Sequence, residues 1–132
     1  EAEFIKYASN VFYARKVNFA NALAKSAEKL GVNYENIRLA MGADYRLGES
    51  HIDVHHGGYK GFGGFCIPKD LDAFIQFAKA NGLASVYVML MADRNFNEAL
   101  LAEQGLTPEA VSHHIDKLEE KLTGRNHDQS RN

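Results

Sequence analysis

The chain is organised around one stretch, Gly61-Phe62-Gly63-Gly64-Phe65-Cys66-Ile67-Pro68-Lys69-Asp70. This stretch contains the single cysteine of the chain, one of its two prolines and three of its eleven glycines. Glycine tolerates positive φ and has no Cβ, so a glycine-rich turn lets the backbone approach a ligand closely. Pro68 suits the first position of a helix, where its missing N–H is not needed. The spacing therefore predicts a helix over residues 69–80, with Cys66 just before its N-terminus.

The position of Cys66 has two interpretations. The partial positive charge of a helix N-terminus, together with Lys69 nearby, favours the nucleophilic thiolate. A lone cysteine is also often a small buried hydrophobic residue, and Asp70 by itself is typical of a first-turn charge favoured by the helix dipole. On its own, the stretch predicts either a nucleophile at the mouth of a turn or a cysteine of the core.

The overall composition is that of an ordinary single domain. The 132 residues are 45% hydrophobic and 24% charged, with a formal net charge of -2 and a pI near 6.3. This balance argues against general binding of nucleic acid or of a membrane surface. One cysteine excludes an internal disulfide and fits a reducing, cytoplasmic setting, and no apolar run is long enough to span a bilayer. Because the chain begins at Glu1 already in a helical pattern, we expect it to be a piece of a longer protein.

A long amphipathic helix is predicted at the N-terminal end. From Glu3 to Leu30, apolar residues recur in steps of three and four, and Gly31 provides a stop in the left-handed conformation. Because further apolar residues widen the stripe, the helix needs partners on more than one side, and a homodimer interface is one candidate. The residues of the stripe are Ile5, Ala8, Phe12, Val17, Ala20, Ala24, Ala27 and Leu30, widened by Phe4, Val11, Phe19 and Leu23.

Three to four further helices are predicted, and no segment alternates as a strand would. Each is marked by a capping residue, a glycine or a proline: residues 34–41 after Asn33, 69–80 before Asn81-Gly82, 85–100 capped by Ser85, and 108–122 after Thr107. The predicted fold class is all-α, with one domain over residues 1–124 and a polar tail over residues 125–132.

The glycine-rich segment 49–65 contains His51, Asp53, His55 and His56. A loop of this length inside a compact domain is often functional. The spacing matches no helical two-histidine motif, and no cysteine ligand lies nearby. We therefore predict solvated histidines and no metal site.

Three short motifs stand in order along the first eighty residues. Residues 1–10 read EAEFIKYASN, residues 44–48 read DYRLG, and residues 61–70 are the stretch quoted above. They are similar to the helix start A-E-x-x-K-x-x-x-N, the turn D-x-R-[IL]-G and the active-site loop G-[FY]-G-G-x-C-x-P-K-D of the UDP-glucose/GDP-mannose dehydrogenase family. The resemblance covers residues 1–80 and implies the central helical domain of that family.

The resemblance implies a four-electron oxidation of the C6 alcohol of a nucleotide sugar to a carboxylate with two NAD⁺. Cys66 would attack the C6 aldehyde, and the resulting thiohemiacetal would be oxidised to a thioester that water hydrolyses. Lys6 and Asn10, which share a face of the first helix, would stabilise the oxyanion or hold the water. Asp70 would orient or deprotonate that water. These residue types suit those tasks, as nucleophile, oxyanion donors and general base respectively.

Further residues are assigned to ligands by matching positions. Arg46 would reach the substrate of the neighbouring subunit, and Gly61, Phe62, Gly63 and Gly64 would lie against the UDP-sugar. Lys69 is the residue of this chain assigned to NAD. No G-x-G-x-x-G motif follows a strand, so the NAD-binding domain is absent from this chain and we expect the chain alone to be inactive.

Two departures and three alternatives accompany the resemblance. Residues 49–60 form a longer insertion than in the best-known members, and the C-terminal substrate-closing domain is not recognisable. The Pro-Lys-Asp ending separates the chain from the related N-acetyl-mannosamine branch; UDP-glucose is the leading substrate, and GDP-mannose stays open. A helical dimerisation module with vestigial catalytic residues is a second hypothesis, and a cysteine hydrolase pairing Cys66 with His55 or His56 is a third.

Overall fold

The computed structural model describes residues 1–55 and 58–112. The described residues form four helices and no strand: α1 (Ala2–Leu30), α2 (Tyr34–Gly42), α3 (Cys66–Ala80) and α4 (Ala84–Glu103). A further helical segment begins at Pro108 and reaches Ser112, after Thr107 Oγ1 accepts the Ala110 N–H at 3.1 Å. The all-α prediction is confirmed. The remainder of the predicted last helix, to Leu122, and the tail of residues 125–132 lie outside the described residues.

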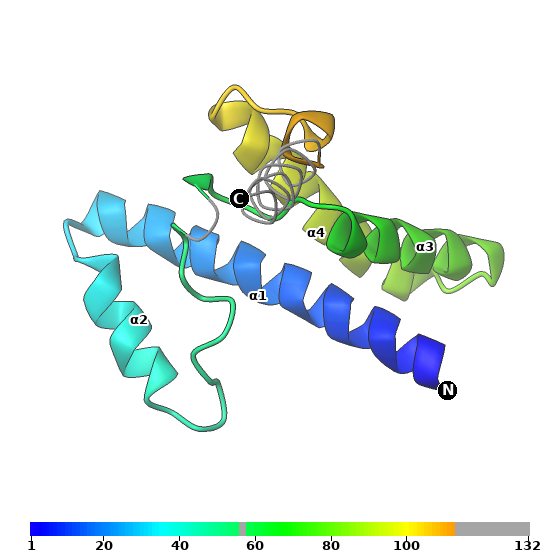
Figure 1. Cartoon of the computed structure of the whole chain (residues 1–132), viewed down its shortest axis with the longest axis horizontal. Coiled ribbons are helices and arrows are strands. Elements are labelled where there is room, and N and C mark those ends of the chain that lie inside the picture. Colours follow the sequence, from blue (N-terminus) through cyan, green and yellow to red (C-terminus); the bar gives the residue numbers. More distant parts are fainter. Residues whose placement is uncertain (56–57, 113–132) are drawn as a thin grey trace, which may run out of the picture.

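Helix α1 is the element against which the other helices pack (Figure 1). Its 29 residues contain neither glycine nor proline, and Gly31 ends it in the left-handed conformation with φ 70°, as predicted. The Phe4 and Phe74 rings contact edge to face at 6.1 Å, and Asn10 bonds Asp70. Helices α1 and α3 therefore lie side by side and antiparallel. None of the helices in residues 1–55 and 58–112 has the length and apolar character needed to cross a membrane.

Two hydrophobic clusters hold the helices together. The larger one joins α1, α3 and α4 and consists of Val11, Ala14, Phe62, Leu71, Ile75 and Leu90. Each large side chain fully buried there contributes about 1.5–3 kcal/mol. The smaller one joins α1 to the insertion and consists of Ala20, Ile52 and Val54, with Tyr34 of α2 packed beside it. Tyr34 also donates its hydroxyl to the Ile52 carbonyl at 2.6 Å, so the insertion is anchored on α1 and α2.

The inward face of α1 differs from the predicted stripe. Ile5, Phe12 and Phe19 are about 60% exposed, whereas Val11, Ala14, Asn18 and Asn21 face the interior. The reason is that α3 and α4 cover a face on which small and amide side chains recur at helical spacing. The residues of the predicted stripe that lie on the opposite face stay largely exposed, and the Phe12 ring there lies 6.0 Å from Lys16 Nζ.

The predicted starts of α3 and α4 are wrong, whereas the predicted caps Asn33 and Thr107 are confirmed. Helix α3 begins at Cys66 rather than after it, with Pro68 inside the first turn, where backbone N–H groups need no helical acceptor. Helix α4 begins at Ala84 without a side-chain cap, so Ser85 is not its cap. Asn33 caps α2 as predicted, because its side chain accepts the Glu35 N–H at 3.0 Å.

Candidate active site

Cys66 is exposed and occupies the first position of α3. The backbone N–H groups of a first turn lack helical acceptors, so this end of α3 carries a partial positive charge. Lys69 adds a full positive charge in the same turn, and its Nζ lies 5.0 Å from the centroid of the Phe65 ring. The sulfur is thus accessible at an electropositive helix end.

Asn10 of α1 and Asp70 of α3 contact each other directly. Asn10 Nδ2 donates to Asp70 Oδ2 at 2.6 Å, and Asp70 is only 2% exposed. Cys66 and Asp70 stand four residues apart on α3, so they share a face of that helix. The structure therefore joins two of the four predicted catalytic residues and puts the third one helical turn away.

Lys6 stands apart from this group. It lies one turn before Asn10 on α1, and because α3 runs antiparallel, Cys66 lies on the other side of the Asn10–Asp70 pair. Lys6 is exposed, and within the described residues it forms no hydrogen bond or ion pair with Asp70. Its role in the predicted group depends on the reach of its long side chain.

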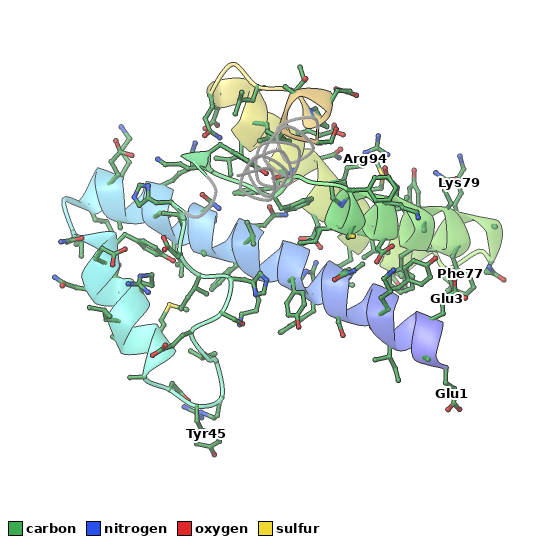
Figure 2. The ribbon with its side chains drawn as sticks, viewed as in Figure 1. Glu1, Glu3, Tyr45, Phe77, Lys79 and Arg94 are labelled. Atoms are coloured by element: carbon green, nitrogen blue, oxygen red, sulfur yellow. The ribbon has the colours of Figure 1, made fainter. Side chains whose placement is uncertain are left out.

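A cavity of about 380 Å³ opens where the start of α1 meets the end of α3. Glu3 and Phe77 mark this end of the molecule (Figure 2). Tyr7 lines the cavity and donates its hydroxyl to Glu3 Oε1 at 3.3 Å. The negative charge of Glu3 is the main cause that raises the pKa of Tyr7, and Asp70 adds to it. A ligand in this cavity would lie about one turn from the Asn10–Asp70 pair.

The glycine-rich loop before Cys66 is packed closely into the protein. Gly61 has φ 106°, and a Cβ there would lie 2.6 Å from Asn97 Oδ1. A Cβ on Gly63 would strike the Tyr59 hydroxyl and the Val111 side chain. Burial also raises the pKa of Tyr59. The glycines at these two positions are therefore required by the loop's own packing.

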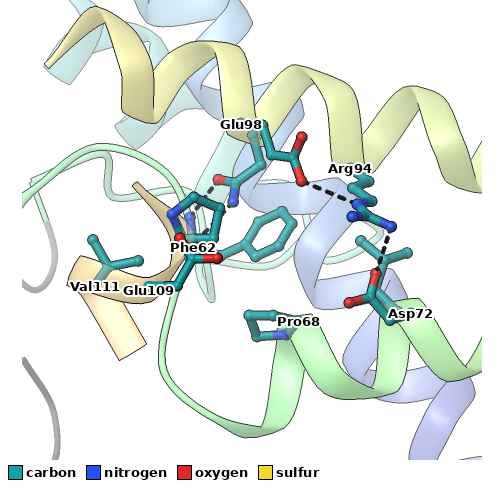
Figure 3. A pocket seen from close by; sticks show the side chains of 10 residues that line it. Phe62, Pro68, Asp72, Arg94, Glu98, Glu109 and Val111 are labelled. Atoms are coloured by element: carbon teal, nitrogen blue, oxygen red, sulfur yellow. Dashed lines mark hydrogen bonds and ion pairs between the residues drawn. The ribbon is translucent and has the colours of Figure 1, made fainter. Parts of the chain in front are cut away.

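Phe62 lies in the core, 5% exposed, between α3, α4 and the segment at Pro108 (Figure 3). Its backbone N–H donates to Asn97 Oδ1 at 2.8 Å, and its carbonyl accepts from Asn97 Nδ2 at 2.9 Å. Its ring and its N–H are thus engaged within the chain, whereas the predicted role was contact with the sugar nucleotide. Asn97, which bonds both backbone groups of Phe62, was missed by the sequence reasoning, because a single amide on a helix belongs to no motif with a recognisable spacing.

Arg46 lies in the turn after α2, and its sequence neighbour Tyr45 is far from α3 (Figure 2). It pairs with Asp44 at 2.7 Å, while its side chain stays 74% exposed. Hydrogen bonds from the Arg46 side chain, followed by one from its backbone N–H, lower the pKa of Asp44. The turn thus presents a preorganised guanidinium to the surroundings rather than to the chain's own Cys66.

The histidines of the insertion do not assemble a metal site among the described residues, where no group of three potential ligands occurs. The His51 ring stacks on Tyr13 at 4.2 Å, and the His55 N–H donates to Asp53 at 3.0 Å. His56 lies outside the described residues. The signal that sequence reasoning overlooked here is the apolar pair Ile52 and Val54, which anchors the insertion to the smaller hydrophobic cluster.

Residues 1–99 match the sequence model of the UDP-glucose/GDP-mannose dehydrogenase family, central domain. The chain is 41% identical over 95 residues to UDP-glucose 6-dehydrogenase of Pseudomonas aeruginosa, which is 72% of this chain and 20% of that protein. It is 34% identical over 129 residues to UDP-glucose 6-dehydrogenase of Rickettsia bellii, which is 95% of this chain and 26% of that protein. The chain therefore spans only a fifth to a quarter of the length of these relatives. With its helical architecture and the match over most of its length, the chain belongs to the UDP-glucose/GDP-mannose dehydrogenase family.

Proposed function

We propose that this chain is the catalytic-cysteine and dimerisation domain of an NAD-dependent nucleotide-sugar 6-dehydrogenase that oxidises UDP-glucose to UDP-glucuronate in the cytoplasm. Relatives named UDP-glucose 6-dehydrogenase, at 34% and 41% identity, support the substrate class. The domain would extend over residues 1–124, followed by the tail of residues 125–132. The observation that carries the proposal is the Asn10–Asp70 contact one helical turn from an exposed Cys66.

Cys66 would act as the nucleophile. Its thiolate adds to the C6 carbonyl carbon of the sugar aldehyde, and the carbonyl oxygen becomes the oxyanion of a thiohemiacetal. Loss of a hydride from C6 turns this adduct into a thioester. Water then adds to the thioester carbon, the Cys66 thiolate is expelled, and the carboxylate product forms with release of two protons.

Asn10 would stabilise the oxyanion, and Asp70 would orient or deprotonate the water. Asp70 accepts one Asn10 N–H and so holds the amide in place, which leaves the second N–H of Asn10 available to an oxyanion. A buried carboxylate one turn from the sulfur is suited to orient or deprotonate the attacking water. Lys6 would approach from the far side of the pair, and its ammonium would stabilise negative charge developing on the substrate.

NAD⁺ would accept one hydride in each of the two oxidations. The described residues do not provide a complete site for it, because they contain no strand leading into a glycine-rich turn and a helix. A separate domain would therefore hold most of the cofactor, and Lys69, exposed in the first turn of α3, would be the contribution of this chain. We accordingly expect the isolated chain not to form NADH.

The remaining assignments concern substrate and partner. Backbone groups of Gly61, Gly63 and Gly64 are assigned to the UDP-sugar, and the buried Phe62 would support this loop from the core. Arg46 would serve the substrate of a second copy, since its side chain is 74% exposed in the turn after α2, which lies far from α3 (Figure 1). The homodimer would form through α1, whose exposed residues Ile5, Phe12 and Phe19 repeat every seven residues on one face.

The test uses the full-length protein that contains this chain. With NAD⁺ and UDP-glucose, we expect two NADH per sugar, and we expect Cys66→Ser to abolish or stall turnover. Activity with GDP-mannose instead of UDP-glucose would keep the mechanism and change the substrate. No turnover with any nucleotide sugar, or full activity of Cys66→Ser, would refute the proposal.

The second candidate is a helical dimerisation module without catalysis. The exposed apolar face of α1 favours it as much as it favours the enzyme. Light scattering on the chain should show a dimer that Phe12→Asp converts to a monomer, whereas Leu39→Asp, equally exposed on α2, leaves it intact. A dimer whose full-length form lacks all dehydrogenase activity would select the module. A chain that is monomeric before substitution would contradict dimerisation through α1.

A further inference from the structure

Two side-chain amides, Asn97 of α4 and Gln104 directly after its last residue, hold the segment that leads to the cysteine loop. Asn97 accepts the Phe62 N–H at 2.8 Å and donates to the Phe62 carbonyl at 2.9 Å. Gln104 accepts the Lys60 N–H at 2.8 Å and donates to the Lys60 carbonyl at 2.8 Å. Each amide therefore binds both backbone groups of one residue, as a neighbouring strand would in a sheet.

The two amides reach the segment from the same side of the helix. Asn97 and Gln104 are seven residues apart, about two helical turns, so they project from one face of α4 and its end. Their partners Lys60 and Phe62 flank Gly61, whose φ of 106° takes this segment out of regular strand geometry. The backbone of residues 60–62 is therefore held by side-chain bonds from the helix and its end.

The segment is also held close to the helix between the two amide pairs. Gly61 lies directly against α4, where a Cβ would meet Asn97 Oδ1 at 2.6 Å and the Leu100 and Leu101 side chains at 3.5 Å. The Phe62 ring is fixed in the larger hydrophobic cluster. Only three residues then separate this anchor from Cys66. The placement of the sulfur depends directly on where α4 holds the backbone.

We propose that Asn97 and Gln104 are positioning residues that set the location of Cys66 relative to the Asn10–Asp70 pair. The inference rests on the proposed dehydrogenase function. The two amides do not touch the sulfur and act through the backbone of residues 60–62. Displacement of a reacting group by about 1 Å costs on the order of a hundredfold in rate. Loss of the bonds from Asn97 and Gln104 should therefore reduce turnover in an enzyme that stays folded.

The experiment compares variants of the full-length enzyme in steady-state kinetics with UDP-glucose and NAD⁺. Asn97→Ala should lower kcat about 10- to 100-fold, and Gln104→Ala, at the more exposed pair, about 3- to 10-fold. The KM for NAD⁺ should stay within about twofold of the unsubstituted value, because in the proposed function a separate domain would hold most of the cofactor. Asn95→Ala is the matched control, since Asn95 is exposed on the same helix.

Further measurements separate positioning from mere destabilisation. Thermal unfolding identifies any variant that is not folded at the assay temperature. If Asn97→Ala is unfolded there, the kcat of Gln104→Ala tests the positioning role instead. Gln104→Glu keeps the acceptor for the Lys60 N–H and should recover part of the lost kcat. If folded Asn97→Ala and Gln104→Ala both keep the kcat of Asn95→Ala, the positioning role is refuted while the proposed function stands. If the unsubstituted enzyme turns over no nucleotide sugar, the proposed function fails and a role in placing Cys66 for it fails as well.

Discussion

Removal of the Asn10 amide should destabilise the domain far more than removal of an exposed amide. Asp70 is 2% exposed, and within the described residues its carboxylate has one hydrogen-bond donor, Asn10 Nδ2 at 2.6 Å. Asn10→Ala leaves that carboxylate buried without a donor. A hydrogen bond to a charged group contributes about 1.5–3 kcal/mol, and a buried polar group left unsatisfied costs about as much.

We therefore expect Asn10→Ala to lower the free energy of unfolding by about 2–3 kcal/mol. Asp70→Asn should reduce this loss, because a neutral amide without a partner is less costly to bury than a carboxylate. A double-mutant cycle over Asn10→Ala and Asp70→Asn should give a coupling energy of about 1.5 kcal/mol. These values are large compared with the about 5–15 kcal/mol that holds a typical domain folded.

Urea unfolding of the four proteins of the cycle, followed by circular dichroism, measures these energies. A loss of 2 kcal/mol moves the midpoint by about 1 M if the urea dependence is about 2 kcal/mol per M. Asn95→Ala, at an exposed position, should stay within about 0.5 kcal/mol of the unsubstituted chain. A coupling energy below about 0.5 kcal/mol would refute the view that this contact satisfies a buried carboxylate.

Three other substitutions, the first compared with a control substitution, test separate parts of the structure. Gly61→Ala should cost about 2–4 kcal/mol in urea unfolding, since strain at φ 106° adds to a steric clash, whereas Gly31→Ala, at φ 70° in open space, should cost about 1 kcal/mol. Arg46→Gln should raise the pKa of Asp44 in an NMR titration, because the side-chain hydrogen bonds from Arg46 that lower this pKa are lost. The stability that the lowered pKa provides is present above the unfolded-state pKa of Asp44 and disappears as the pH falls through its folded-state pKa. An unchanged Asp44 titration would contradict the assignment. Tyr34→Phe should cost about 1 kcal/mol in thermal or urea unfolding, and a neutral result would mean that water replaces its 2.6 Å bond to the insertion.

Much of the local structure could be predicted from the sequence because its causes are local. Gly31 ends α1, and Asn33 caps α2, through interactions confined to a few neighbouring residues. The motif that contains Cys66 and Asp70 was identified for the same reason, since chemistry at a helix start depends on a short, ordered run of residues. Helix starts were less predictable, because α3 begins two residues before Pro68 and α4 begins without a polar cap.

The tertiary structure decided which of these features meet. Apolar periodicity in α1 does not name a partner, so it could not show that Val11 is buried while Phe12 is exposed. The antiparallel packing of α1 on α3 brings Asn10 to Asp70 across sixty residues of sequence, and the amide of Asn97 reaches the cysteine loop from a third helix. Helix propensities, caps and motifs depend on residues close in the sequence. Contacts between distant segments depend instead on which helix faces pack against each other in the folded domain.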